Sequence, residues 1–378
     1  MRFFILIIIF FTFFDLFAQL PIISPFAVSL GATPFLTGIA VGMYSLSNII
    51  GNILSGVISD KKGPYVILVT GLTSTGIVLF SYGLANDPYS LLAIRFFHGL
   101  AAGLTVPAAF TYLANNTVQH KRGKSVAISG AFVGLAAIIG PAFGAVYASR
   151  TSTPDMMAIT GILLLSLGLA AFFLLKKQRT SQKAEPAKSE HDSNIAWNRG
   201  LLLAFSGAFF LMFSQGVLAY MLPLKVEGLN FKTEMSGLLL STFGISAILV
   251  FLLPINRIFD RIHPLRTLII GFLLMGSSLF LLSAVSNAFW MYATMCIYGI
   301  GFAFLFPSIN SLLIDSTHPH SRGKAYGYFY AFFSLGVVGG SSFTGALELS
   351  PNEGFMVSGG LLLTVAAAAT VFRRNNRH

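Results

Sequence analysis

The sequence contains few charged residues. Asp, Glu, Lys and Arg make up 10% of its 378 residues, whereas a soluble domain carries about 25%. So few charges cannot cover a surface that faces water, which excludes an ordinary soluble protein. The chain also has a single cysteine, Cys296, which excludes a disulfide framework and a thiolate metal cluster. This scarcity of charge is typical of a protein whose outer surface contacts lipid.

The sequence is instead rich in long apolar runs. Hydrophobic residues make up 55% of the chain, and the mean hydropathy is +0.77. A helix needs about 20 apolar residues to cross the ~30 Å hydrocarbon core. Twelve such runs predict an all-α integral membrane protein. They are 3–28, 35–58, 65–85, 89–114, 125–148 and 156–175, then 200–223, 235–255, 267–285, 288–314, 325–347 and 355–372.

The first run has a second interpretation, because a secretory signal peptide also places a basic residue, here Arg2, before an apolar core. The length of the run, the presence of Asp15 in its middle and the eleven runs that follow favour a membrane helix.

The basic residues lie between the apolar runs. The net charge of +11 would suggest a nucleic-acid partner if the charges gathered on one face. Instead, nearly all of them fall in alternate connecting segments, on the same side as the N-terminus. The exceptions are Arg95, within a run, and Arg150, Lys225 and Lys232, in segments on the other side. The positive-inside rule then predicts that both termini are cytoplasmic, and we expect no nucleic-acid partner.

The chain repeats itself across a polar segment, residues 176–199, which is expected to be a cytoplasmic linker. Matching residues lie 200 positions apart on its two sides. They include Asp60 and Asp260, Pro64 and Pro264, Gly71 and Gly271, Gly76 and Gly276, Gly99 and Gly299, Gly140 and Gly340, and the RGK sequences at 122–124 and 322–324. We predict two pseudo-symmetric six-helix bundles, residues 1–175 and 200–378, the second ending in a short cytoplasmic tail. A solute site near the midplane and alternating access follow from this organisation, although a repeat could also serve packing alone.

Three short motifs carry a family resemblance. Residues 56–63 (GVISDKKG) are similar to the pattern G-x-x-x-D-R/K-x-G, and residues 95–99 (RFFHG) to R-x-x-Q-G with His in place of Gln. Residues 140–145 (GPAFGA) are similar to G-P-x-x-G-G. With these motifs the chain resembles the major facilitator superfamily, and within it the twelve-helix drug:proton antiporters. It departs from the family where Pro64-Tyr65 replaces a basic pair and where Ala145 replaces the final Gly.

The resemblance implies conformational roles for the motif residues. It implies that Asp60 contacts the eleventh helix and latches one conformation, although an ordinary solvated helix cap would suit Asp60 as well. Independently of the resemblance, glycines four residues apart allow close helix packing, and a proline permits a kink. The likeness of 140–144 to a signature associated with antiporters implies antiport in preference to symport. The conformational set is Gly56, Asp60, Gly63, Gly140, Pro141, Gly144 and Asp260.

Ionisable residues inside the apolar runs are candidates for proton coupling, because they are rare and costly in hydrocarbon. Asp15 lies roughly 18 Å from the cytoplasmic end of its helix, and Arg95 roughly 10 Å from the outer end of its own. These depths are comparable, so we predict that Asp15 binds the coupled proton and that Arg95 sets its affinity. His98 lies one turn from Arg95. The alternatives are a structural Asp15–Arg95 pair that does not titrate and a histidine that only hydrogen-bonds within its helix.

Polar and aromatic residues at helical spacing predict the wall of a solute cavity. They are Gln19, Tyr44, Asn48, Asn52, Gln215, Tyr298, Phe302, Asn310, Tyr326 and Tyr330. Gln215 occupies the position that matches Asp15, so the second half lacks the acid. Such a wall suits an amphipathic solute, neutral or cationic, better than a sugar.

Together these features predict a secondary transporter, not an enzyme, that uses alternating access. We expect proton-coupled antiport that exports drug-like or metabolite solutes, as in multidrug resistance; the alternative is a proton symporter or facilitator that imports a small nutrient. A transport-dead sensor would need a soluble partner domain, for which the linker is too short. The chain is expected to be a monomer in a bacterial-type inner membrane, with a small molecule, protons and lipid as its partners and with no cofactor or metal.

Overall fold

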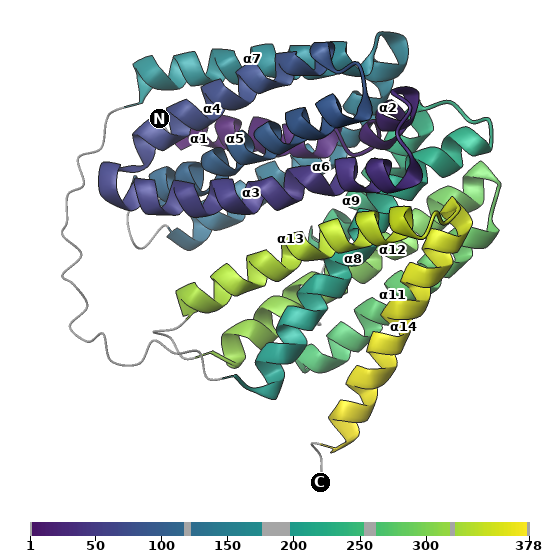
Figure 1. Cartoon of the computed structure of the whole chain (residues 1–378). Helices are drawn as coiled ribbons and strands as arrows, with labels where there is room; N and C mark the ends of the chain where they lie inside the picture. Colours follow the sequence, from purple (N-terminus) through teal and green to yellow (C-terminus); the bar gives the residue numbers. More distant parts are fainter. Residues whose placement is uncertain (1, 117–121, 176–196, 253–261, 318–321, 376–378) are drawn as a thin grey trace. The chain divides into compact units, whose positions relative to one another are not determined.

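The computed structural model describes residues 2–116, 122–175, 197–252, 262–317 and 322–375, and the regular structure of these ranges is helical (Figure 1). The first half contains α1 (Arg2–Ala18), α2 (Ile23–Ser29), α3 (Pro34–Lys62), α4 (Pro64–Phe80), the 3₁₀ helix η1 (Ser81–Leu84), α5 (Pro88–Asn115), α6 (Arg122–Arg150) and α7 (Thr153–Leu174). The second half contains α8 (Arg199–Gly228), α9 (Glu234–Leu252), α11 (Pro264–Ala284), α12 (Ala288–Asp315), α13 (Arg322–Ala346) and α14 (Pro351–Asn375).

Several helices begin where the sequence places a capping residue. The side chains of Thr33, Asp87 and Ser152 accept backbone N–H groups in the first turns of α3, α5 and α7. These groups have no partner inside the helix, so the caps stabilise each start. Proline follows as the first residue of α3 and α5, where its missing N–H costs nothing.

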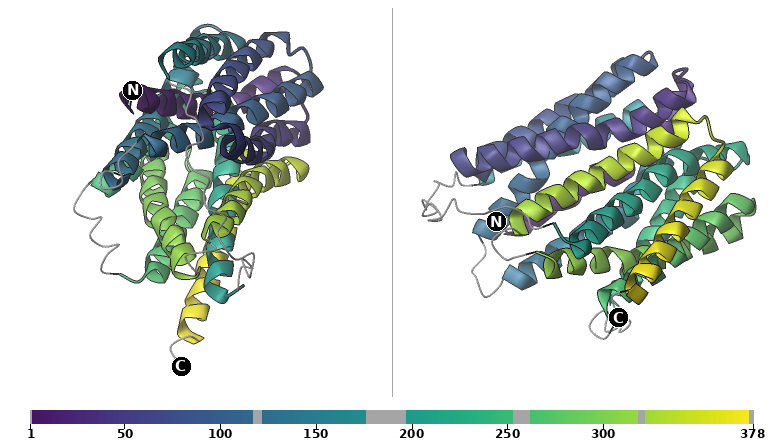
Figure 2. Two further views of the ribbon diagram at one scale, coloured as in Figure 1. Left: turned by 90° about the vertical axis from the view of Figure 1, so that its left-hand side faces the viewer. Right: turned by 60° about the horizontal axis from the view of Figure 1, so that its bottom comes forward.

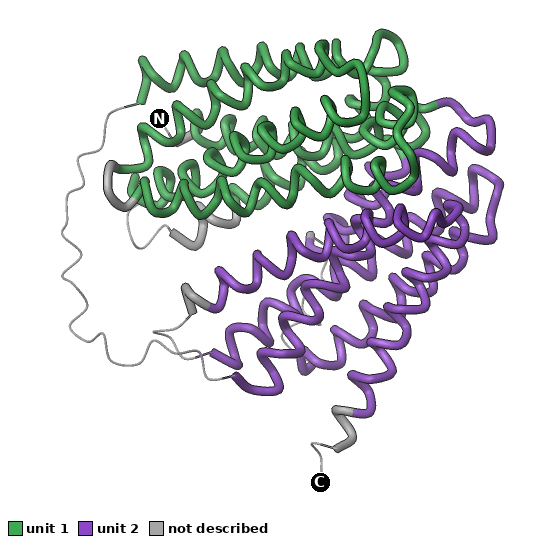
Figure 3. Tube along the Cα trace, viewed as in Figure 1, with its two compact units in different colours: residues 1–188, 233–238 green, residues 189–232, 239–378 purple. Residues whose placement is uncertain are grey.

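The chain divides into two units (Figure 3). Unit 1 contains residues 1–188 and 233–238, and unit 2 contains residues 189–232 and 239–378. The change at 188/189 lies inside the linker predicted at 176–199, most of which is outside the described residues. The grouping of 233–238 with unit 1 has no counterpart in the predicted domain boundaries.

The two units repeat the same helix pairings. In unit 1, α4 packs on α5 and α7, and α1 packs on α6; in unit 2, α11 packs on α12 and α14, and α8 packs on α13 (Figure 2). Glycines at matching positions make the same close approach. A Cβ atom on Gly76 would lie 2.9 Å from the carbonyl oxygen of Gly161, and one on Gly276 would lie 3.0 Å from that of Gly359. The sequence repeat at an offset of 200 is therefore also a repeat of helix packing.

The number of helices that could cross a membrane is close to the predicted twelve. Within the described ranges, ten helices are long and apolar enough, and α1 with α2 makes an eleventh if this bent pair is one span. The run predicted at 325–347 forms the 25-residue helix α13, which is not among these. Its tyrosines, glycines and serines lower its apolar character.

The first predicted run, 3–28, is two helices instead of one. α1 and α2 meet at an angle of 46°. Pro21 lies in the break, and because proline has no N–H, the helical bond to the carbonyl of Phe17 is lost. The amide of Leu20 bonds to that carbonyl instead, at 3.3 Å. The break places Asp15 in the last turn of α1.

The motif residues differ in their surroundings. Gly63 joins α3 to α4 with a φ of +82°, which favours glycine. A Cβ atom on Gly56 would meet nothing within 4 Å, whereas Gly140 and Gly144 lie against the backbone of α1 at Ala18. Pro141 continues α6 between them. The side chain of Asp60 and the whole of Asp260 lie outside the described residues, so the latch stays a prediction.

The sequence-based placement of Lys225 in an outer loop is wrong. Lys225 lies in the last turn of α8 and is 5% exposed. Its ammonium group donates to the backbone carbonyls of Leu282 and Ser283 at the end of α11 and, at 2.9 Å, to Oδ1 of Asn352 at the start of α14. Lysine at a helix C-terminus satisfies carbonyls that have no helical partner, so Lys225 ties three helices of unit 2 together.

Candidate functional site

The ionisable side chains predicted for proton coupling meet inside unit 1. Asp15 comes from α1, and Arg95 and His98 come from one face of α5, three residues apart. Asp15 is 2% exposed, Arg95 3% and His98 0%. Three polar side chains that are this deeply buried need hydrogen-bond partners, because an unpaired polar group costs free energy in an apolar interior.

The partner of Asp15 is His98. Nε2 of His98 lies 3.0 Å from Oδ2 of Asp15. The other carboxylate oxygen, Oδ1, is buried and has no hydrogen-bond partner among the described residues. Asp15 therefore has one satisfied oxygen and one oxygen that is free to accept a proton.

Arg95 is held by α3 and by the α1–α2 break. Its Nε donates to the carbonyl of Ala40 at 2.8 Å, and its Nη2 to that of Val41 at 3.0 Å. Its Nη1 donates to Oε1 of Gln19. No direct Asp15–Arg95 pair is formed: among the described residues, the side-chain partner of Asp15 is His98. The planar guanidinium fork instead matches two successive carbonyls of α3.

Tyr82 completes this group and was missed by the sequence analysis. Its hydroxyl lies 2.9 Å from Nδ1 of His98 and 3.4 Å from Nη1 of Arg95, and its side chain is fully buried. A tyrosine near the end of a membrane helix is common, so its position in the sequence gave no sign of this role. The turn η1 directs Tyr82 inward.

Tyr44 and Gln19, predicted for the cavity wall, belong to the same buried group. The Tyr44 ring lies 4.9 Å from that of His98, and the Arg95 guanidinium lies 5.2 Å from the centre of the Tyr44 ring. Gln19 also donates to the carbonyl of Asp15 at 3.3 Å. We call this group the buried polar network; its members are Asp15, Gln19, Tyr44, Tyr82, Arg95 and His98.

Asn48 and Asn52, also predicted for the cavity, join α3 to α5. Nδ2 of Asn48 donates to the carbonyl of Gly99 at 3.2 Å, and Nδ2 of Asn52 donates to Oδ1 of Asn48 at 2.8 Å. Gly51 and Gly103 let the two backbones approach closely at the same level. Both amides are half-buried and contribute to helix packing.

Unit 2 has an uncharged counterpart of the network. At an offset of 200, Tyr298 stands in place of His98, Met295 in place of Arg95 and Gln215 in place of Asp15. The Tyr298 hydroxyl lies 2.8 Å from that of Ser214, and Nε2 of Gln215 is buried without a partner among the residues that the structure describes. At these matching positions, the carboxyl, guanidinium and imidazole groups therefore belong to unit 1.

Phe302, Tyr326 and Tyr330, also predicted for the cavity wall, belong to an aromatic strip that joins α12 to α13 and includes Phe243 of α9. Phe302 lies 5.3 Å from Phe243 and stacks on Phe306 at 5.7 Å. Asn310 donates to the carbonyl of Phe306, one turn earlier in α12. Tyr326 and Tyr330 stack at 6.3 Å on α13.

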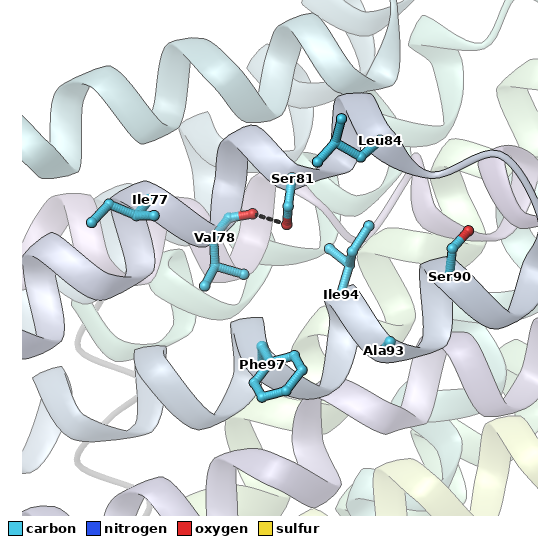
Figure 4. Close-up of a pocket in the computed structure, with 8 residues that line it drawn as sticks. All are labelled: Ile77, Val78, Ser81, Leu84, Ser90, Ala93, Ile94 and Phe97. Carbon is cyan, nitrogen blue, oxygen red and sulfur yellow. Dashed lines mark hydrogen bonds between the residues drawn. The ribbon is translucent and has the colours of Figure 1, made fainter.

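A separate groove of about 480 Å³ lies between α4, η1 and α5 (Figure 4). Its lining is Ile77, Val78, Ser81, Leu84, Ser90, Ala93, Ile94 and Phe97. The Ser81 hydroxyl bonds to the carbonyl of Val78, as Figure 4 shows, and none of the described residues that line the groove is charged. Ile77, Leu84 and Phe97 are exposed along it, as expected where membrane helices contact lipid.

The chain is similar to known transporters along most of its length. It is 23% identical over 336 residues to an MFS-type transporter of Methanocaldococcus jannaschii, with 85% of each chain covered. It is 25% identical over 337 residues to the multidrug resistance protein MdtG of Escherichia coli, covering 86% of this chain and 82% of MdtG.

Solved structures show the same fold. A mutant of the nucleoside transporter NupG matches with a TM-score of 0.85 at 16% identity, covering 98% of this chain and 99% of NupG. A bacterial homologue of the human lysosomal transporter Spinster matches with a TM-score of 0.79 at 13% identity, covering 98% and 95%. A family model described as Major Facilitator Superfamily matches residues 5–248 and 204–378. This chain is therefore a multi-pass membrane transporter and belongs to the Major Facilitator Superfamily.

Proposed function

We propose that this transporter is a proton-coupled antiporter that exports drug-like or metabolite solutes, with Asp15 as the group that binds the coupled proton. The observation that carries the proposal is the environment of Asp15. Asp15 is 2% exposed, Oδ2 is paired with His98, and Oδ1 has no partner in the part of the chain that the structure describes.

An ionised carboxylate in this position is only half satisfied. A buried acceptor that has lost its partners in water costs about 1–3 kcal/mol. Asp15 also lies in the last turn of α1, at the helix end that disfavours negative charge. A proton on Oδ1 would remove the negative charge, and with it the cost of burying that charge and its unfavourable interaction with the helix end. His98 and the nearby Arg95 have the opposite effect, because they stabilise the ionised form. Opposing influences of this kind support reversible proton binding.

Two observations support export. The MdtG proteins are named for multidrug resistance, and several of them are 24–25% identical to this chain. The Gly140-Pro141-x-x-Gly144 spacing supports antiport, and Gly140 and Gly144 pack on α1 beside Ala18, three residues after Asp15. A change at Asp15 can thus act directly on the α1–α6 contact.

The aromatic strip of unit 2 supports an amphipathic solute. Aromatic faces bind planar apolar groups and attract cations, and the strip offers Phe302, Phe306 and Tyr330 together with the amide of Gln215. We assign the transporter to a bacterial-type inner membrane as a monomer with both termini in the cytoplasm. The distribution of basic residues supports this orientation.

The second candidate is a proton symporter that imports a small nutrient. The shared fold with NupG, which is a nucleoside transporter, supports this candidate. Both candidates use the same carboxyl group, and they differ in whether proton and solute move in opposite directions.

Transport by inside-out membrane vesicles distinguishes the two. Vesicles with an acidic lumen are given ethidium, a planar cation, or are loaded with uridine, and a dye reports the pH of the lumen. Export predicts that ethidium enters while the lumen becomes more alkaline. Import predicts that uridine leaves the lumen together with protons. Vesicles without the transporter serve as the control, and ethidium entry that is independent of the pH gradient contradicts proton-coupled antiport.

A further inference from the structure

The hydrogen bonds around Tyr82 determine where His98 carries its proton. This inference rests on the proposed role of Asp15 and concerns the residues that support it. The Tyr82 hydroxyl, fully buried, has two partners: Nη1 of Arg95 at 3.4 Å and Nδ1 of His98 at 2.9 Å. A hydroxyl has one hydrogen to donate and also accepts on its oxygen, and in a buried site that hydrogen needs an acceptor because an unsatisfied donor costs free energy.

Arg95 sets the direction. A guanidinium group has five N–H donors and no acceptor, and it is not deprotonated in proteins. The Tyr82 oxygen must therefore accept from Nη1 of Arg95. Its own hydrogen is left for the other neighbour, Nδ1 of His98, which then acts as the acceptor.

A histidine whose Nδ1 accepts a hydrogen bond is neutral and carries its proton on Nε2. That nitrogen faces Oδ2 of Asp15 at 3.0 Å, so the N–H donates to the carboxylate. A second proton, on Nδ1, would turn the Tyr82 hydrogen away from its acceptor inside a buried site. It would also place an imidazolium beside the Arg95 guanidinium.

We propose that Tyr82 is a positioning residue that holds His98 as the neutral Nε2–H form. His98 is then a fixed donor to Asp15 and does not carry the coupled proton. The proton comes from water and forms an O–H bond at Oδ1 of Asp15, and the same bond breaks on release, while no bond to hydrogen on His98 changes. Among the described residues, the titratable groups in contact with His98 are Asp15 from α1, Tyr44 from α3 and Tyr82 from η1. Arg95 from α5 contacts the Tyr82 hydroxyl.

Nitrogen-15 NMR of histidine-labelled protein in detergent tests the protonation state directly. The chain has 7 histidines, and the signal that disappears in His98→Gln is that of His98. We expect the neutral Nε2–H pattern from about pH 8 down to about pH 5, through the range in which an ordinary histidine gains its second proton. In Tyr82→Phe we expect His98 to titrate within this range.

Tyr65→Phe is the matched control. The Tyr65 hydroxyl donates to the carbonyl of Phe172 at 2.9 Å, so this variant also removes one bonded hydroxyl from unit 1 but leaves the histidine untouched. The His98 signal of Tyr65→Phe should follow the wild type. An imidazolium signal in the wild type near neutral pH, or identical His98 titrations in the wild type and Tyr82→Phe, would overturn the proposal.

Proton uptake separates this inference from the proposed function. The purified protein is acidified in weak buffer, and its proton uptake is compared with that of two variants. Asp15→Asn should take up one proton fewer than the wild type. If it takes up as many protons as the wild type, the role of Asp15 is refuted. His98→Gln keeps an N–H donor near the Nε2 position but cannot hold a second proton, so it should retain the uptake. Loss of the same proton in folded His98→Gln would identify His98 as the carrier and overturn this inference alone.

Discussion

Nε2 of His98 lies 3.0 Å from Oδ2 of Asp15, although 83 residues separate the two in the sequence. The contact joins α5 to α1 at the break between α1 and α2, where Arg95 also reaches Gln19. If Asp15 gains or loses a proton as proposed, the helix contacts around it would change directly. Unit 2 has Tyr298 at the position matching His98, with Ser214 as its partner, and both side chains stay uncharged at physiological pH.

The approach of α3 and α5 should be sensitive to a single methyl group. A Cβ atom on Gly103 would lie 2.6 Å from the carbonyl oxygen of Asn48, so Gly103→Ala should destabilise the protein by about 1–3 kcal/mol through overpacking. Gly130→Ala is the control, because a Cβ atom there meets nothing within 4 Å. Thermal unfolding in detergent measures both variants. If the two variants are equally stable, the α3–α5 contact has room for a methyl group at Gly103.

Lys225→Met should weaken unit 2. It leaves the carbonyls of Leu282 and Ser283 and the side chain of Asn352 without their donor, at an expected cost of about 1–3 kcal/mol. Lys232→Met removes the same charge from an exposed position and should leave thermal unfolding nearly unchanged. If both variants unfold at the same temperature as the wild type, the ammonium group contributes nothing to stability.

The stabilisation of the fold by the Asp87 cap of α5 should be lost in acid. The backbone N–H and the side chain of Ser90 lower the pKa of Asp87 below its ordinary value. The carboxylate therefore stabilises the fold above the unfolded pKa of about 3.9, and this contribution is lost as the pH falls through the lower folded value. Asn caps a helix without titrating. The wild type should therefore lose unfolding temperature in acid faster than Asp87→Asn does. If the difference between the two unfolding temperatures is the same at every pH, the prediction is contradicted.

The orientation in the membrane can be tested with introduced cysteines. Cys296 is the one native cysteine, so Cys296→Ala gives a clean background. Ser189→Cys, in the predicted cytoplasmic linker, should react with a membrane-impermeant maleimide only after the cells are opened. Asn86→Cys, in the exposed turn between η1 and α5, should react in intact cells. The reverse labelling pattern would invert the orientation inferred from the basic residues.

Much of this molecule could be predicted from its sequence. The apolar runs predicted the helices, and the offset of 200 predicted the repeated packing, because length and apolar character dictate membrane helices directly. The break in the first run was missed, although Pro21 marked it. The involvement of Asp15, Arg95 and His98 followed from the rarity of ionisable groups in apolar runs.

Which of these groups touch could not be predicted. Depth along a helix does not give the rotation of that helix, so Asp15 and Arg95 at similar depth were expected to be neighbours. In the structure, backbone carbonyls of Ala40 and Val41 hold the guanidinium, and sequence carries no sign of such backbone partners. Tyr82 was missed for a related reason, since only the fold brings η1 beside α5.

Asp15→Asn in proteoliposomes tests the central claim most directly. Asn preserves the size of the side chain but cannot take up a proton, so an imposed pH gradient should no longer drive ethidium uphill, while downhill movement continues. Asp155→Asn is the control, because it changes an exposed acid at the start of α7 in the same way and should behave like the wild type. Uphill ethidium transport by correctly folded Asp15→Asn in response to the pH gradient would contradict the assignment of the coupled proton to Asp15.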